Sequence, residues 1–234
     1  EKEASEEEVE ISEEEKKKYG FVTVAMGDGI SSIFKDLGID YVIEGGQTMN
    51  PSTQDILDAV NKINAEHIFI MPNNKNIIMA ANQAAEISDK DIRVVPTTTI
   101  PQGIVCATMF NLDSDVDDNF NNLKDTIQEV KTGSVTYAVR DTEIDGINIK
   151  EGNMLGLVEG KIKEVGEDKT IVAGKVLDNM IDEDCELITV YYGEEVSAEE
   201  ANEFETELKE KYEDLDIQFY KGNQPLYYFL MSVE

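Results

Sequence analysis

Four short polar loops hold the residues of this chain that are best suited to recognising a ligand or a partner. Each loop follows an apolar run typical of a β-strand and precedes a helical pattern. Glycines leave backbone N–H groups unhindered, and amide and hydroxyl groups beside a helix N-terminus favour an anion or a partner's carboxylate. The candidate partner-binding residues are therefore Gly27, Asp28, Gly45, Gly46, Gln47, Thr48, Asn50, Asn73, Asn74, Lys75, Asn76, Thr97, Thr98 and Thr99.

The elements around these loops alternate between strand and helix. Strands are expected at residues 21–24, 41–43, 67–71 and 92–95, and helices at 30–37, 52–63, 76–87 and 103–110. Ser52, with Asp55 three residues later, predicts a capping box at the second helix. Such alternation is typical of a mostly parallel sheet with flanking helices, in which the carboxyl ends of the strands deliver their loops to one edge.

Local backbone needs explain part of the same pattern. Gly27 and Gly29 begin a dinucleotide-binding fingerprint, and Glu44 stands where a ribose-binding acid would stand, but Ser32 replaces the third glycine. A tight strand-to-helix turn accounts for these glycines equally well. Asn, Ser and Thr also cap helices, although four such loops on one edge exceed what capping requires.

The chain carries little catalytic equipment. Its one histidine, His67, begins an apolar strand at the end opposite the loops and is expected to be structural. Two distant cysteines and one histidine cannot form a zinc site, and Lys75 lacks the glycines of a phosphate-binding loop. We therefore assign no catalytic and no metal-binding residue.

Composition excludes several classes of partner. A formal charge of -30 and a pI near 4.2 oppose binding to nucleic acid or anionic lipid and favour a basic partner or none. Cys106 and Cys185 lie in apolar settings, as expected of thiols in a reducing cytoplasm. No apolar run is long enough to span a membrane, and the chain does not begin with methionine, so we expect a piece of a longer cytoplasmic protein.

Three regions follow along the chain. Residues 1–18 have the composition of a disordered acidic linker, and residues 19–133 form the expected parallel α/β subdomain. A helix at 117–132, stopped by Gly133, closes that subdomain. Residues 134–234 predict an α+β subdomain, with a strand meander followed by helices at 170–181 and 198–212 and strands at 187–192, 216–220 and 227–233.

Four stretches resemble one known family in combination. They are Met71 to Ala81, Glu44 to Thr53, Val95 to Gly103, and Gly222 to Tyr228, where Asn223 replaces the commoner second glycine. Together they are similar to the C-terminal region of the dihydroxyacetone-kinase-like large (FakA-type) subunit of bacterial fatty acid kinase and, more distantly, to the DegV family of fatty-acid-binding proteins. The resemblance runs from about Tyr19 to Glu234 and implies a two-subdomain, DegV-like α/β fold.

The resemblance also implies a division of labour. An upstream kinase domain of the same protein would bind ATP and magnesium, and a separate DegV-type protein would carry the fatty acid whose carboxylate is phosphorylated to an acyl phosphate. This chain would hold no cofactor and would dock the carrier through its loops. Two alternatives stay open, namely a phosphate- or carboxylate-binding or enzymatic domain acting on its own, and a scaffold or dimerisation module.

Overall fold

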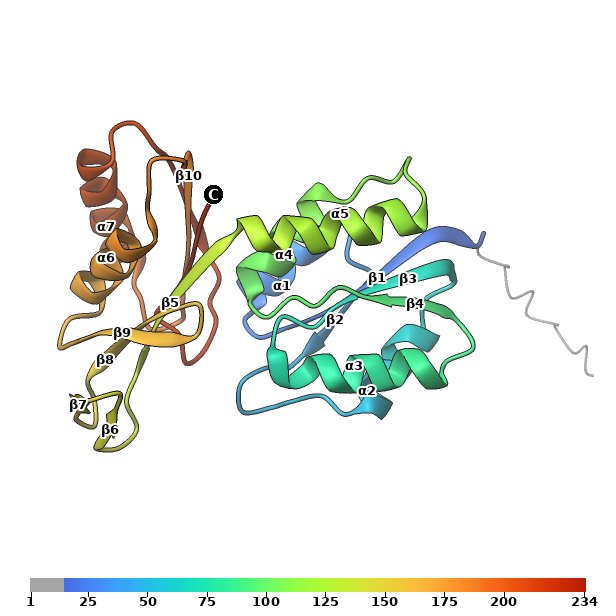
Figure 1. Ribbon diagram of the computed structural model, residues 1–234, viewed down its shortest axis with the longest axis horizontal. Helices are drawn as coiled ribbons and strands as arrows, with labels where there is room; N and C mark the ends of the chain where they lie inside the picture. The colour runs from blue at the N-terminus through green and yellow to red at the C-terminus, as the bar shows by residue number, and fades with distance from the viewer. Residues whose placement is uncertain (1–14) are drawn as a thin grey trace, which may run out of the picture.

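A computed structural model describes residues 15–234, and its two halves, residues 15–130 and 131–234, lie side by side (Figure 1). The first half alternates strands with helices, as the sequence predicts. In chain order it contains β1 (Lys17–Ala25), α1 (Asp28–Asp36), β2 (Tyr41–Glu44), α2 (Thr53–Asn61), β3 (Ala65–Met71), α3 (Lys75–Ile87), β4 (Asp91–Val94), α4 (Ile100–Met109) and α5 (Val116–Glu129).

The four strands of the first half form one parallel sheet in the order β2-β1-β3-β4. Val22 of β1 lies beside Tyr41 of β2 on one side and Ile70 of β3 on the other. Because all four strands run the same way, the loops that follow them meet at one edge. The predicted parallel α/β architecture is therefore confirmed.

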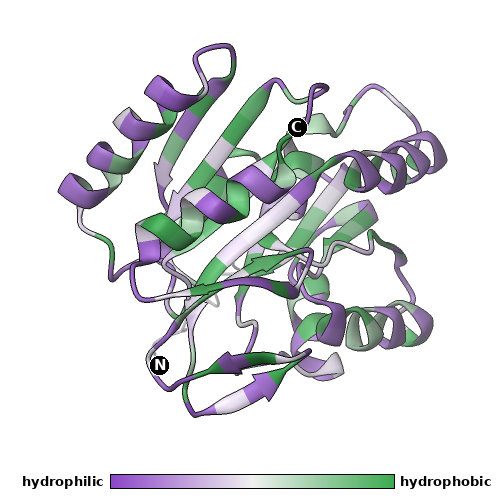
Figure 2. Ribbon diagram, turned by 60° about the vertical axis from the view of Figure 1, so that its left-hand side comes forward, coloured by the Kyte–Doolittle hydropathy of each residue, from purple (hydrophilic) through white to green (hydrophobic). Residues whose placement is uncertain are grey.

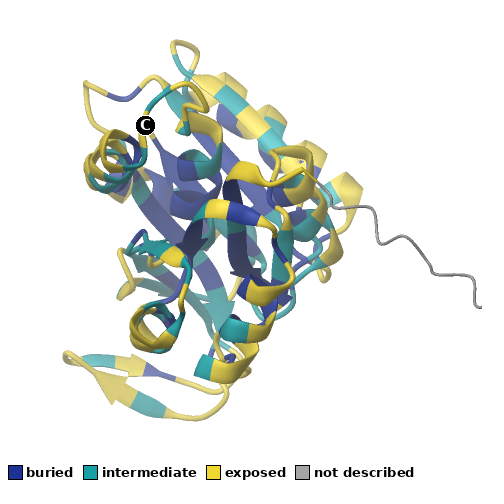
Figure 3. Ribbon diagram, turned by 90° about the vertical axis from the view of Figure 1, so that its right-hand side faces the viewer, coloured by how far each residue is buried: buried dark blue, intermediate teal, exposed yellow. Residues whose placement is uncertain are grey.

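Helices cover both faces of this sheet. On one face, Ile56 of α2 and Ile77 of α3 are fully buried against the strands. On the other face, α1, α4 and α5 bury Phe34, Ile104 and Leu123 against Phe69 of β3. Apolar residues concentrate on the strands and the inner sides of the helices (Figure 2), while the outer helix turns are exposed (Figure 3).

The second half is a mixed six-stranded sheet with a small separate hairpin. The sheet order is β11-β10-β12-β5-β8-β9, and only the pair β10 and β11 is parallel. The elements are β5 (Lys131–Tyr137), β6 (Thr142–Ile144), β7 (Ile147–Ile149), β8 (Met154–Val158), β9 (Lys161–Gly166), α6 (Lys169–Met180), β10 (Leu187–Tyr192), α7 (Ala198–Lys211), β11 (Asp216–Lys221) and β12 (Phe229–Val233).

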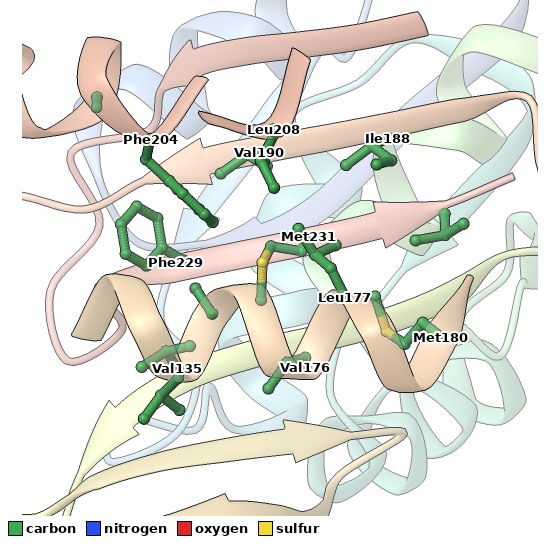
Figure 4. Packing of buried hydrophobic residues seen from close by; sticks show 14 of the residues in the cluster. Val135, Val176, Leu177, Met180, Ile188, Val190, Phe204, Leu208, Phe229 and Met231 are labelled. Carbon is green, nitrogen blue, oxygen red and sulfur yellow. The ribbon is translucent and has the colours of Figure 1, made fainter. Parts of the chain in front are cut away.

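Helices α6 and α7 pack on one face of this second sheet (Figure 4). Leu177 of α6 and Phe204 of α7 meet Val190 and Phe229 of the strands, and all four are buried. The opposite face turns toward the first half, where Tyr191 of β10 belongs to the cluster around α1, α4 and α5. The two halves therefore share apolar contacts.

The predicted linker is wrong at its C-terminal end. Strand β1 begins at Lys17, which pairs with Ala65 of β3 and whose Nζ donates a hydrogen bond to Asp40 at 2.8 Å. Backbone pairing orders this polar strand end, and composition does not reveal it. Residues 1–14 of the predicted linker lie outside the described residues.

The predicted role of Gly133 is also wrong. Helix α5 ends at Glu129, and Gly133 lies inside β5, so the predicted boundary after residue 133 falls within a strand. A Cβ at Gly133 would stand 2.6 Å from Cγ1 of Val176 and 2.9 Å from Sδ of Met180, both on α6. This glycine lets α6 approach the sheet closely.

Candidate functional site: the loop edge and the interlobe cavity

The loops after β1, β2, β3 and β4, here called the loop edge, meet a cavity between the two halves. This interlobe cavity has a volume of about 520 Å³. Nine of the fourteen candidate residues line it, namely Gly45, Gly46, Gln47, Asn73, Asn74, Lys75, Asn76, Thr98 and Thr99. Gly27, Asp28, Thr48, Asn50 and Thr97 do not line the interlobe cavity.

The second half supplies the opposite wall. Its contributions come from β5, from the turn between β8 and β9, and from the segment before β12, and they are Thr132, Gly133, Ser134, Leu157, Glu159, Gly160, Lys161, Gln224, Pro225, Leu226, Tyr227 and Leu230. Burial raises the pKa of Tyr227 to about 12, so this phenol stays neutral. Sequence reasoning missed this wall because only the tertiary fold brings it to the loops.

Asn73 is part of the frame of the loop edge. It is buried with φ 59°, and its Nδ2 donates hydrogen bonds to Thr23 Oγ1 at 2.8 Å and to the Val24 carbonyl at 2.9 Å. Thr97, which is fully buried, donates from Oγ1 to Asn73 Oδ1 at 2.9 Å. The side chains of these two candidate residues hold the ends of the strands together and are not available to a partner.

Asn74 and Thr99 cap the helices that begin at the loop edge. Asn74 Oδ1 accepts from the backbone N–H of Asn76, and Thr99 Oγ1 from that of Gln102, so α4 begins at Ile100, three residues before its predicted start. Capping therefore explains these two candidates. Lys75, Asn76 and Thr98 are exposed beside them.

The loop after β2 presents a tight turn to solvent. Gly46 and Met49 exchange two backbone hydrogen bonds of 2.9 Å, and Gln47 at the tip has φ 48°. Gln47, Thr48, Met49 and Asn50 are all exposed. Pro51 and the predicted capping box of Ser52 with Asp55, which the structure confirms, then start α2.

Gly27 and Asp28 lie at the junction between the halves. The Ile30 N–H donates to the Gly222 carbonyl at 2.9 Å, and a Cβ at Gly29 would stand 2.0 Å from the Lys221 carbonyl oxygen. The segment 27–30 thus packs against the segment 221–224. Gly27 has φ 99°, which is why this turn needs glycine whether or not it binds anything.

The exposed residues of the loop edge are almost uncharged in a strongly acidic chain. Stretches 45–54, 71–85 and 94–112 contain one charged residue, Lys75, whereas 30% of the whole chain is charged. The exposed side chains here are amides, hydroxyls and methionines, including Met49 at 57% and Met79 at 70% exposure. Burial explains charge depletion in a core but not on an exposed surface.

The histidine and the cysteines take structural positions. His67 Nδ1 lies 2.5 Å from Asp91 Oδ2 at the start of β3, at the opposite end of the sheet from the loop edge. Cys106 and Cys185 are buried free thiols, and burial raises the pKa of Cys106 to about 12. Within residues 15–234, no group of three or more His, Cys, Asp or Glu side chains is placed to hold a metal ion.

No helix between residues 15 and 234 is both long enough and apolar enough to cross a lipid bilayer.

The fold is that of the DegV proteins. A protein of Thermotoga maritima described as having a fatty acid binding function matches with a TM-score of 0.68 at 12% identity, covering 93% of this chain and 99% of that one. The fatty acid kinase (Fak) B3 protein of Streptococcus pneumoniae, solved with linoleic acid, matches with a TM-score of 0.62 at 11% identity, covering 93% and 99%. Such low identities establish the fold alone.

The sequence defines the family more closely. The chain belongs to the FakA-like C-terminal family of fatty acid kinase, whose pattern matches residues 20–234. Protein YloV of Bacillus subtilis is 50% identical over 219 residues, covering 94% of this chain and 40% of YloV. An uncharacterized Staphylococcus aureus protein (strain USA300) is 41% identical over 213 residues, covering 91% and 39%. The chain thus spans about two fifths of the length of these relatives.

Proposed function

We propose that this chain is the carrier-docking domain of a fatty acid kinase. It binds a DegV-type fatty-acid-binding protein, and an upstream kinase domain of the same protein then phosphorylates the bound fatty acid to an acyl phosphate. In this proposal ATP and magnesium belong to the upstream domain, and the reaction takes place in the cytoplasm.

Family membership and length support the proposal. The matched family takes its name from a fatty acid kinase, and the relatives are long enough to include a further domain. The Fak B3 protein of Streptococcus pneumoniae, which was solved with linoleic acid, has the same fold as this chain. A carrier and its docking domain would then be built on one architecture.

The observation that carries the docking role is the uncharged surface of the loop edge. The centres of protein interfaces are depleted in charged residues because a charge that loses its water there must find a new partner. Gln47, Met49, Asn76, Met79 and Thr98 are exposed and neutral, and they surround the mouth of the interlobe cavity or follow it by one helical turn. A partner can cover this surface with little desolvation cost.

The charge of the rest of the chain would act before contact. A net charge of -30 attracts a basic patch on the carrier at long range and speeds encounter, while the uncharged loop edge provides the contact area. Buried Asn73 and Thr97 support this surface from below.

Competition for the carrier tests the proposal. Added in excess, this chain should bind the carrier and lower acyl phosphate formation by the full-length kinase. The same chain with Met79→Lys should not inhibit, whereas Ile171→Lys, an equal change at a residue 61% exposed on α6, should inhibit like the unaltered chain. Unchanged acyl phosphate formation in the presence of the unaltered chain would refute the docking role.

A further inference from the structure

The interlobe cavity has an apolar lining drawn from both halves of the chain. Met26 and Pro72 line it from the first half, and Leu157, Leu226 and Leu230 line it from the second. Its volume of about 520 Å³ lies within the range of small-molecule sites. The cavity therefore offers a small molecule apolar contact on two sides.

The charged groups at the cavity are two lysines and one carboxylate. Lys75 is the first residue of α3 and Lys161 is the first residue of β9, so each half supplies one cation. The single carboxylate, Glu159, already accepts a hydrogen bond from the Thr132 N–H at 2.5 Å. In a chain of net charge -30, this is a local excess of positive charge.

The lining selects the chemical class of the ligand. No arginine lines the cavity, so the paired hydrogen bonds that favour phosphate are missing, while one carboxylate suits two lysines and neighbouring amides and hydroxyls. We propose that the interlobe cavity binds an amphipathic monocarboxylate, with its head at Lys75 and Lys161 and its apolar tail against Met26, Leu157, Leu226 and Leu230. This site goes beyond the docking role and does not depend on it.

Leu226 gives the tail region a reason to be apolar. Its φ is 69°, a conformation that Asn or Gly adopts more easily than leucine, and Thr136 Oγ1 donates to its carbonyl at 2.7 Å to hold it. A leucine that costs free energy at this φ and lines the cavity is explained if its side chain contacts a ligand.

The test is calorimetric titration of the chain alone with decanoate, 1-decanol and inorganic phosphate. Decanoate should bind at one site per chain, decanol about tenfold or more weaker because it lacks the charged head, and phosphate should neither bind nor displace decanoate. Combined Lys75→Gln and Lys161→Gln should weaken decanoate by about tenfold or more. The matched control, Lys35→Gln with Lys175→Gln, changes the net charge equally at exposed residues outside the cavity and should leave affinity unchanged.

Leu226→Asn tests the tail separately, because asparagine tolerates the positive φ and preserves the fold, which thermal melting verifies. It should weaken decanoate but not alter the difference made by the lysine changes. Absence of saturable decanoate binding, equal binding of decanoate and decanol, displacement by phosphate, or equal loss in the control would each overturn the proposal. Because the carrier is absent, none of these results bears on docking.

Discussion

Asn223 donates a hydrogen bond from Nδ2 to Oδ1 of Asp28 at 2.8 Å, although the two residues are 195 positions apart in the chain. The bond joins the loop before β12 to the first turn of α1 and so connects the two halves. Asn223 has φ 54°, where asparagine is tolerated better than most residues. An asparagine in place of the glycine common in this family thus keeps the turn and adds a contact.

Substitutions at Asn223 should separate the turn from the contact. Asn223→Gly keeps the backbone conformation but removes the hydrogen bond, and we expect it to lower the free energy of unfolding by about 1 kcal/mol. Asn223→Ala also introduces strain at positive φ, costing a further ~1 kcal/mol. Urea unfolding measures both values, and an alanine variant as stable as the glycine variant would show that the turn is not under strain.

Two helical glycines should respond oppositely to the same substitution. In Gly103→Ala of α4, the new Cβ would stand 2.1 Å from Asn73 Oδ1, and Asn73 is fixed by its own hydrogen bonds, so we expect a loss of about 2 kcal/mol. In Gly174→Ala of α6, nothing lies within 4 Å, and alanine should stabilise the helix by about 0.5–1 kcal/mol. Melting temperatures that move in the same direction would contradict this account of Asn73.

Much of the fold follows from the sequence because its signals are local. The capping box at Ser52 and the strand-to-helix pattern of the first half specify α2 and the parallel sheet without long-range information. The true start of β1 at Lys17 and the packing role of Gly133 could not be predicted, because each depends on a partner element distant in the chain, β3 and α6 respectively.

The candidate site follows the same division. The loops that line the cavity can be predicted, since each follows its own strand. The interlobe position of Asp28 and the opposite wall with Lys161 and Leu226 arise from tertiary packing and leave no local signal. The burial of Asn73 is likewise hidden, because an asparagine in a polar loop looks the same whether its amide faces solvent or a strand.

Acid should weaken the contact between β5 and the end of α6. The hydrogen bond from Lys131, followed by those of Cys185 and Asp184, lowers the pKa of the Asp182 carboxyl to about 2. Because the folded value lies below the ordinary value of 3.8, the stabilisation is present above about pH 4 and is lost as the pH falls toward about 2. The stability difference between the unaltered chain and Asp182→Asn, measured by urea unfolding, should therefore shrink over that interval. A difference independent of pH would mean that the ion pair contributes nothing.

The chain alone should neither hydrolyse ATP nor form acyl phosphate. Lys75 stands without the glycines of a phosphate-binding loop, and residues 15–234 place no three metal-ligating side chains together. A coupled ADP assay with magnesium, with and without a fatty acid, measures this. Magnesium-dependent turnover that Lys75→Gln abolishes would reverse the assignment and make the chain an enzyme.

Binding kinetics between this chain and its DegV-type carrier test the central claim most directly. With the carrier immobilised, association of the unaltered chain should slow as salt is raised, because the charge of -30 steers the encounter. Met79→Lys, which places a charge on the neutral loop edge, should speed dissociation and weaken the complex by about 1–3 kcal/mol, while Ile171→Lys on α6 should bind like the unaltered chain. Salt-independent association with equal affinity for both variants would contradict docking through the loop edge, and failure to form any complex would contradict the docking function itself.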